Sequence, residues 1–394
     1  MSSTVADRSL SGNDISVHLS PQTAKGAIDV SPVFDQFRRL EGKAAKTVSY
    51  VTSNEVKTNR QARMQIQDST THAAELSFEL NQSTAKYIDG LLHSDPVDNG
   101  LVAQTTIAAT GTGFTDSGNG FGAFLPGDWF KSLGFADTDL NTFYKVVTAT
   151  AGVITTQVAP VATESAGASV TFESEKTSSG SAQTYYTVQN RTVDKSAAGD
   201  IAFDTFFDAI INTGSIEVGE TGIVIGTFGL NIETLTSGVA IIAGQTDNAI
   251  DTSEAVSSIN NVSTIYVDGV DSASSVKSFS IEFNNNYQGD RSAATQGERY
   301  AFGDVESTGS LVTRAVISNT FDWRSRYRNS TPFALAVLIE FDDGNWMIFE
   351  VLQAIITEHT MADGSNVIAS NEMSYAAEED DVTAKTLQFF RNFS

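Results

Sequence analysis

Two segments of the sequence, VKSFSIEF at residues 276–283 and FALAVLIEFDDGNWMIFEVLQA at residues 333–354, decide the fold. In the first, Phe279, Ile281 and Phe283 alternate with polar residues, which is typical of a half-buried β-strand. In the second, the same alternation runs from Leu335 to Phe341 and is followed by the turn sequence DDGN and a returning apolar run. This order predicts a β-hairpin beside a further strand.

A short helix is predicted between these strands. Residues 321–328, FDWRSRYR, follow Asn319 and Thr320, and either of these two suits the N-cap position. Strands, helix and hairpin together predict a β-sheet with a helix on one face.

Composition narrows the class of protein. The 394-residue chain has no cysteine, and 48 Asp and Glu against 24 Lys and Arg give a net charge of −24. The missing cysteines exclude disulfides and thiolate chemistry, and the negative charge disfavours ordinary binding to phosphate backbones or anionic membranes. The first residues have no basic and apolar leader, and no apolar run is long enough to span a bilayer, so we expect a soluble, mainly β protein.

The first half of the chain is predicted to hold an arm and a sheet unit. Residues 1–31 are polar and aperiodic and indicate an N-terminal arm that orders against a neighbour. Residues 32–95 and 168–243 are assigned to the first unit. Its predicted elements are a strand in which Leu76, Phe78 and Leu80 alternate, a helix over residues 85–93 capped by Ser83 and Thr84, a return to the main sheet at residues 170–175, a helix at 203–211 and a strand at 223–235.

An insert and a linker divide the remaining sequence. The glycine-rich, turn-rich residues 96–167 predict a small β domain that faces outward, and residues 244–264 predict a polar linker. Residues 265–394 form the predicted second unit. Because strand, polar loop, strand, helix and further strands follow in one order twice, we predict an internal repeat of two antiparallel β-sandwich or barrel units, each with a short flanking helix.

No motif indicates catalysis, a metal or a cofactor. The histidines His18, His72, His93 and His359 lack metal-ligand spacing, and residues 137–141 lack the turn glycine of a calcium loop. Residues 118–122 are glycine-rich without the context of a phosphate loop, and Arg324, Arg326 and Arg328 indicate a salt-bridge face or a subunit contact. We therefore predict no enzyme activity and no cofactor.

Both halves resemble the tail tube proteins, or major tail proteins, of long, non-contractile-tailed bacteriophages (siphophages). The resemblance covers about residues 32–95 and 168–394 and rests on the order of elements. The segments that carry it are TSNEVKTNRQ (52–61), AAELSFEL (73–80), TAKYIDGLL (84–92), IVIGTFGLNI (223–232), IEFNNN (281–286), FGDVESTGSLVTRAVIS (302–318) and DDGNW (342–346).

The resemblance implies a structural virion protein in the phage tail, assembled in the host cytoplasm. Its copies would close into rings, stack into a tube between tail terminator and tail tip proteins, and let genomic DNA pass without specific binding or contact with a membrane. Two units in one chain imply a homotrimeric ring with pseudo-sixfold symmetry; a homohexamer is the alternative if the second unit only decorates one sandwich.

The bore of such a tube would repel DNA if it were acidic. Glu75, Glu79, Glu282 and Glu340 alternate with core positions in the predicted strands and are the bore-facing candidates, although an ordinary solvated face explains each of them equally well. Other classes stay open: a virion decoration or adhesin-type β protein shares this composition, and an enzyme would need a site that the sequence does not display.

Overall fold

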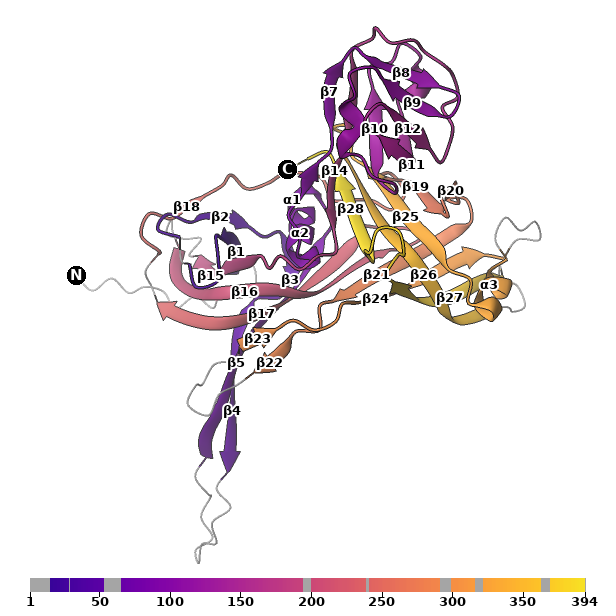
Figure 1. Ribbon diagram of the computed structural model, residues 1–394. Coiled ribbons are helices and arrows are strands. Elements are labelled where there is room, and N and C mark those ends of the chain that lie inside the picture. The colour runs from indigo at the N-terminus through magenta and orange to yellow at the C-terminus, as the bar shows by residue number, and fades with distance from the viewer. Residues whose placement is uncertain are drawn as a thin grey trace, which may run out of the picture.

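The computed structural model describes residues 15–27, 29–52, 65–193, 200–238, 241–290, 299–315, 322–362 and 369–393. These residues form a 19-stranded mixed sheet, a separate 7-stranded sheet and a two-stranded ribbon. The mainly β architecture predicted from the sequence is therefore confirmed. The first half of the large sheet lies at the left of Figure 1, the second half at the right, and the 7-stranded sheet stands above them.

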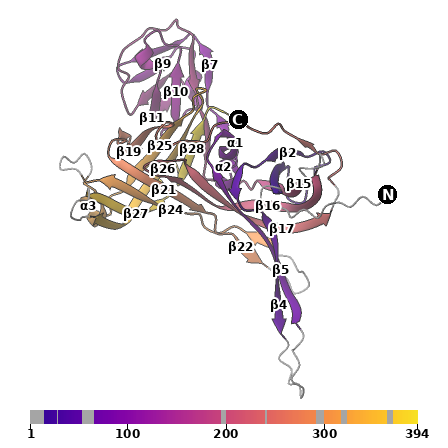
Figure 2. The same cartoon turned by 180° about the vertical axis from the view of Figure 1, so that it is seen from behind.

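In the first half of the large sheet, six strands follow one another as antiparallel neighbours. In spatial order they are β1 (Ile15–Gln22), β15 (Tyr185–Val193), β16 (Asp200–Val218), β17 (Ile225–Gly238), β5 (Gln65–Glu79) and β4 (Ala44–Thr52). The β4–β5 arm projects away from the body of the molecule, as Figures 1 and 2 show from opposite sides.

The second half repeats this order of pairing. Its strands are β19 (Val262–Val267), β25 (Phe333–Glu340), β26 (Trp346–Ala362), β27 (Ser370–Glu378), β24 (Glu306–Arg314) and β21 (Val276–Asn284). The β-bulges also correspond. The β16–β17 ladder slips between Ile211 and Thr213, and the β26–β27 ladder slips between Ile356 and Glu358.

Short strands extend the edges of the large sheet. They are β2 (Val33–Gln36), β3 (Arg39–Glu41), β6 (Val97–Asp98), β14 (Glu175–Ser178), β18 (Thr246–Asp247), β20 (Val270–Asp271) and β28 (Leu387–Arg391), while β22 (Gln288–Asp290) and β23 (Arg299–Ala301) form the ribbon. The pairing of β18 with β2 is parallel. β18 and the first residues of β19 fall within the predicted linker, residues 244–264.

Two predictions for the first half are wrong. Residues 203–211, predicted as a helix, lie in strand β16, and part of the predicted N-terminal arm is strand β1, paired with β15 along its whole length. β16 is buried on both faces, so Phe203, Phe206 and Ile210 are all apolar and imitate helical spacing. Periodicity alone does not separate these two cases.

The helices are shorter than predicted and begin at other residues. Where one helix was expected at residues 85–93, α1 (Gln82–Ala85) and α2 (Ile88–Leu92) follow each other, and the N-cap is Asn81, whose side chain accepts from the Thr84 backbone N–H at 3.0 Å. α3 (Trp323–Asn329) begins after Asp322, which caps it. The expected caps Asn319 and Thr320 lie outside the described residues. α2 and α3 end alike, with His93 and Ser330 in the left-handed conformation.

The 7-stranded sheet is a module with its own core. Its strands are β7 (Leu101–Gln104), β8 (Ile107–Thr110), β9 (Gly113–Asp116), β10 (Trp129–Leu133), β11 (Phe143–Thr150), β12 (Val153–Thr156) and β13 (Val170–Glu173), with 3₁₀ turns at Gly120–Ala123 and Thr138–Leu140. Phe114, Phe130 and Phe172 pack together at its centre. Residues 170–173, predicted to rejoin the main sheet, therefore belong to the module through β13.

Candidate functional site

The histidines do not form a metal centre. Among the described residues no group of His, Asp or Glu side chains is placed to hold a metal ion. Burial lowers the pKa of both His18 and His93 to about 4, which keeps these two rings neutral inside the protein. Nor does any helix of the described part have the length and apolar character to cross a bilayer.

The two halves of the large sheet meet at a continuous antiparallel ladder. The last residues of β16 pair with β21, so that Thr213 lies opposite Asn284, Ser215 opposite Glu282 and Val218 opposite Phe279. Phe279, Ile281 and Phe283 point into the core, as the sequence predicts, and all three are buried. We call this ladder the internal seam.

The chain that follows β21 fastens the internal seam. The Nδ2 group of buried Asn285 lies 3.0 Å from the Leu91 carbonyl and 3.3 Å from that of Ile211. Tyr287 then places its hydroxyl 3.1 Å from His93 Nε2 and stacks on Phe302. One half of the sheet is thus held on the other by side chains as well as by backbone pairing.

Three of the four acidic candidates share the face opposite the core. Glu75 and Glu79 on β5 alternate with buried Leu76 and Phe78, and Glu282 on β21 alternates with Ile281 and Phe283. Glu282 and Ser215, opposite each other in the seam, line a hollow of about 490 Å³ on this face. We call the side of β5 and β21 that carries Glu75, Glu79 and Glu282 the acidic face.

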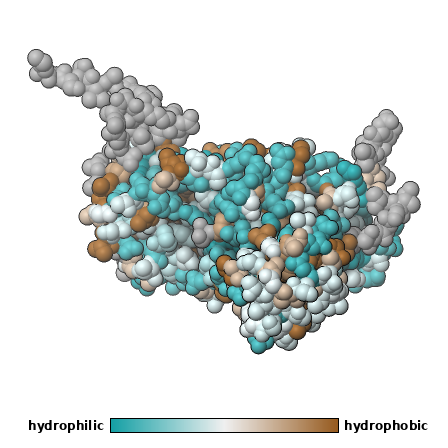
Figure 3. All heavy atoms as spheres, turned by 90° about the horizontal axis from the view of Figure 1, so that it is seen from above, coloured by the Kyte–Doolittle hydropathy of each residue, from teal (hydrophilic) through white to brown (hydrophobic). Residues whose placement is uncertain are grey.

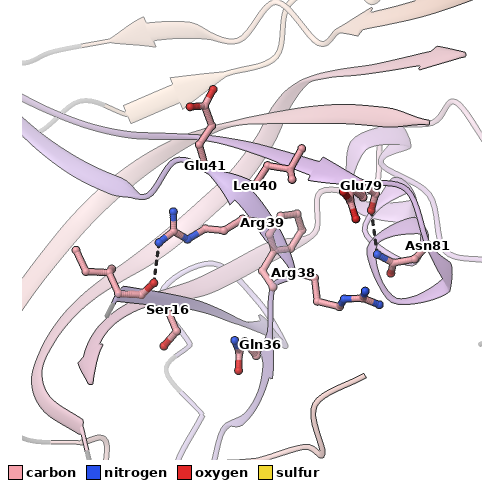
Figure 4. Close-up of a pocket in the computed structure, with 10 residues that line it drawn as sticks. Ser16, Gln36, Arg38, Arg39, Leu40, Glu41, Glu79 and Asn81 are labelled. Atoms are coloured by element: carbon pink, nitrogen blue, oxygen red, sulfur yellow. Dashed lines mark hydrogen bonds between the residues drawn. The ribbon is translucent and has the colours of Figure 1, made fainter. Parts of the chain in front are cut away.

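Glu79 also lines a polar hollow of about 530 Å³ that is formed with β2 and β3. Figure 4 shows Glu79 and Asn81 on one side of it and Arg38, Arg39 and Glu41 around it. Arg39 donates to the Ile15 carbonyl at 2.7 Å, so this arginine helps to hold β1 in place.

Glu340 has different surroundings. It is the last residue of β25, and its Oε1 atom lies 3.6 Å from Nζ of Lys131 on module strand β10. The structure thus places Glu340 beside the module, apart from the other three candidates.

A buried polar pair docks the module on the large sheet. Glu350 of β26 is almost fully buried; it accepts from Trp129 Nε1 at 2.8 Å and forms an ion pair with Lys145. Burial raises the pKa of Glu350, although the Lys145 ammonium opposes this shift. Around the pair, Ala336, Leu338 and Trp346 pack with Trp129 in an apolar cluster.

A further ion pair ties the base of the module to the sheet, because Lys176 Nζ of β14 lies 2.6 Å from Asp128 Oδ1. Beside it, within the large sheet, Arg391 of β28 lies 2.8 Å from Asp89 of α2 and contacts Glu175 of β14. Burial raises the pKa of both Asp128 and Asp89. Sequence reasoning missed these residues; the signal was the single Glu350 within the apolar segment WMIFEVL, because a carboxylate there needs a buried cation.

The remaining sequence motifs have local structural roles. Asp137 caps the 3₁₀ turn at Thr138–Leu140, and Asp116 accepts from the backbone N–H groups of Gly118 and Gly120. In the arginine cluster, Arg326 donates to Asp268 and to the Pro332 carbonyl at the end of α3. On the face shown in Figure 3, apolar side chains are scattered among polar ones instead of forming one broad patch.

The described residues form a large sheet in which one order of antiparallel strands occurs twice, which defines the class of mainly β proteins with a repeated strand order. The chain belongs to the phage tail tube protein family, because the model of that family matches residues 12–377. It is therefore a structural component of the virion tail and not an enzyme. No curated protein matches the chain.

Proposed function

We propose that this chain polymerises as stacked rings into the tube of a siphophage tail, a negatively lined conduit through which the genome is ejected. Family membership supports the tube, and the repeated strand order of the large sheet supports the ring. In this proposal residues 32–95 with 168–243, and residues 265–394, are two tandem tail-tube units, and residues 244–264 connect them. Strand β1 of the flanking residues 1–31 adds to the sheet of the first unit, and residues 170–173 belong to the module.

The repeat carries the proposal for the number of copies. The internal seam already joins two units side by side within one chain. A ring of six units then needs three copies, and fusing the units makes every second interface intramolecular, which raises its effective concentration. A homohexamer is the competing arrangement, in which the second unit only decorates one sandwich.

The bore is assigned to the acidic face. Glu75, Glu79 and Glu282 lie on the side of β5 and β21 that points away from the core, and the chain as a whole has a charge of −24. Carboxylates on a bore wall repel phosphate over about 8 Å at physiological salt, so DNA slides without binding.

The module is assigned to the outside of the tube. In β25, Leu335 and Val337 belong to the main core, whereas Ala336 and Leu338 face the module. In β21, Ile281 faces that same core and Glu282 faces away from it. The module and the acidic face thus lie on opposite sides of the sandwich. Tail terminator and tail tip proteins would contact the ends of the stacked rings.

Electron microscopy of the concentrated protein tests this function. We expect tubes whose cross-section shows three protruding modules and whose rings have the mass of three chains. Rings of six chains would contradict the proposed trimer but not the proposed tube. Protein that stays monomeric and is absent from virion tails, or decorates their surface as a decoration or adhesin protein would, contradicts the function itself.

Charge reversal tests the bore. Replacing Glu75 and Glu282 with Lys adds attractive phosphate contacts that weaken with salt, so ejection from virions carrying the variant should slow most at low ionic strength. Exposed Asp139 of the module, replaced with Lys, is the control and should leave ejection unchanged. Equal ejection rates for both variants at low salt would show that the acidic face does not line the bore.

A further inference from the structure

The internal seam has an unoccupied counterpart at the two ends of the same sheet. The strands β4, β5, β17, β16, β21, β24, β27 and β26 follow one another as antiparallel neighbours. In the repeat, β4 corresponds to β21, and β26 corresponds to β16. The pair that makes the internal seam, β16 with β21, therefore recurs as β26 with β4, but these strands stand at opposite ends of this series of eight strands.

Ladder registers fix the correspondence residue by residue. Ala209 lies opposite Ile232 in the first half and Ala354 opposite Ala377 in the second, which aligns β16 with β26. His72 pairs with Ile232 and Ser307 with Ala377, which aligns β5 with β24. Since Lys46 pairs with His72 and Phe283 with Ser307, Lys46 of β4 holds the position of Phe283 in β21.

Both strands offer an edge at these positions. β25 pairs with β26 no further than Ala354, whereas β27 follows β26 to Ala362 along its opposite edge. In the described part of the chain, no strand pairs with the other edge of residues 356–362 of β26. Among the described residues, β5 is the strand that pairs with β4, and the other edge of β4 is covered at Ala44, where the Asn190 side chain of β15 bonds the backbone N–H and carbonyl. The open edge of β4 therefore begins after Ala44.

We propose that β4 of one copy adds to the free edge of β26 in the next copy, in the register of the internal seam. Ala45 then lies opposite Thr360, Lys46 opposite His359 and Thr47 opposite Glu358. This outer seam rests on the proposed ring and specifies its contact. Because the two edges differ, the contact is head-to-tail, and repeating it closes a ring.

The side chains of the arm agree with this placement. Tyr50 follows Thr47 by three residues, as Tyr287 follows Asn284 in the internal seam. Tyr287 is 8% exposed because it lies against His93 at the end of α2, whereas Tyr50 is 59% exposed. In the outer seam Tyr50 approaches Ser330, which ends α3 of the next copy in the same left-handed conformation as His93. The exposed Val51 and Ile66 beside it are covered by the same contact.

Cysteine cross-linking tests the register without background, since the chain has no cysteine of its own. The test variant is Ala45→Cys with Thr360→Cys, both exposed on the acidic face. Its matched control is Ser215→Cys with Glu282→Cys, the same pair of positions in the internal seam. A slipped control, Ala45→Cys with His359→Cys, places the two thiols on opposite faces. Each reduced variant is assembled, checked for tubes by microscopy and oxidised.

We expect the test variant to form disulfides between chains as fully as the control forms them within a chain, and the slipped variant to form at least tenfold fewer. In denaturing gels the covalent ladder should end at three chains. A test pair that stays reduced in tubes where the control oxidises, or a slipped pair that oxidises faster, overturns the register. A series of cross-linked bands that ends at six chains supports the outer seam and contradicts the trimer. A variant without tubes is replaced by Thr47→Cys with Glu358→Cys and judged in the same way.

Discussion

The outward faces of the two halves differ although their strands pair in the same order. In the second half, Ala336, Leu338 and Ile348 present an apolar surface to the module. The corresponding surface of the first half presents Gln189 and Arg191, and the Arg191 guanidinium stacks on Phe34 and pairs with Asp247 at 2.6 Å. One sheet thus carries a docked domain on one half and short chain segments on the other. The topology therefore determines the sandwich, whereas the outward-facing residues determine which part of the chain covers it.

The largest expected effect concerns the buried pair under the module. Lys145→Met leaves the Glu350 carboxylate buried without its cation, which we expect to lower the free energy of unfolding by about 3–5 kcal/mol. Adding Glu350→Gln should recover much of that loss, because the neutral amide needs no cation and its oxygen still accepts from Trp129 Nε1. Urea unfolding measures both variants. The control is the pair of Lys277 with Glu220, whose carboxylate is exposed, and Lys277→Met should change little. A double variant as unstable as the single one would contradict this account.

The second-largest expected effect is the difference between the two seams in their contribution to the stability of the isolated chain. Phe283→Ala removes a buried ring from the internal seam and should cost about 3–4 kcal/mol in the isolated chain. Lys46→Ala, at the equivalent position of the exposed β4, should leave the stability of the isolated chain within about 0.5 kcal/mol. Chemical denaturation of unassembled protein compares the two. Equal losses would mean that β4 is covered within its own chain.

The ends of α2 and α3 should differ in their response to acid. Folding lowers the pKa of His93 from 6.5 to about 4, so its contribution to stability is complete above pH 6.5 and is lost as the pH falls towards 4. The full loss is about 3 kcal/mol. His93→Asn, which tolerates the left-handed conformation, should flatten the decline in stability between pH 6.5 and 5, although the similarly shifted His18 retains part of it. Ser330→Asn, at the matching end of α3, should leave the pH dependence unchanged.

Glycine at these same two positions gives the smallest effect, with opposite signs. Ser330 has φ of 50°, and Ser330→Gly should stabilise the protein by about 0.5–1 kcal/mol because glycine adopts this conformation without a Cβ clash. His93→Gly gains the same relief but loses the contact with Tyr287, so it should destabilise the protein. Thermal unfolding at neutral pH measures both. Stabilisation by both glycines would show that the His93 ring contributes little to the internal seam.

Alternation in the sequence predicted strands that have one core face and one open face. The strands β5 and β21 are of this kind. The buried Phe78 of β5 and Ile281 of β21 lie on the core faces that alternation predicted. Alternation failed where a strand is covered on both sides. In β16 the apolar residues fall at both parities and imitate a helix; in β25 the continuous run from Phe333 to Ile339 hid the fact that Ala336 and Leu338 contact the module.

For the candidate site, the sequence could suggest exposed acids but not their neighbours. Glu282 and Glu340 occupy equivalent places in two alternating patterns, and only the fold shows that one faces a hollow at the internal seam and the other an ammonium group of the module. The partners of Glu350 lie more than two hundred residues away in the chain, beyond the reach of any local pattern.

The contrast between Phe283 and Lys46 bears on when assembly begins. The internal seam forms as each chain folds and never meets solvent as a free surface, so a phenylalanine is tolerated there. A subunit with an unpaired strand edge must stay monomeric at the concentrations reached during synthesis. Charged residues on such an edge slow premature pairing with other chains. In the proposed outer seam, Lys46 of one copy and Glu358 of the next would set a threshold for nucleation: unassembled subunits would accumulate, and growth would start where an existing ring presents several edges at once.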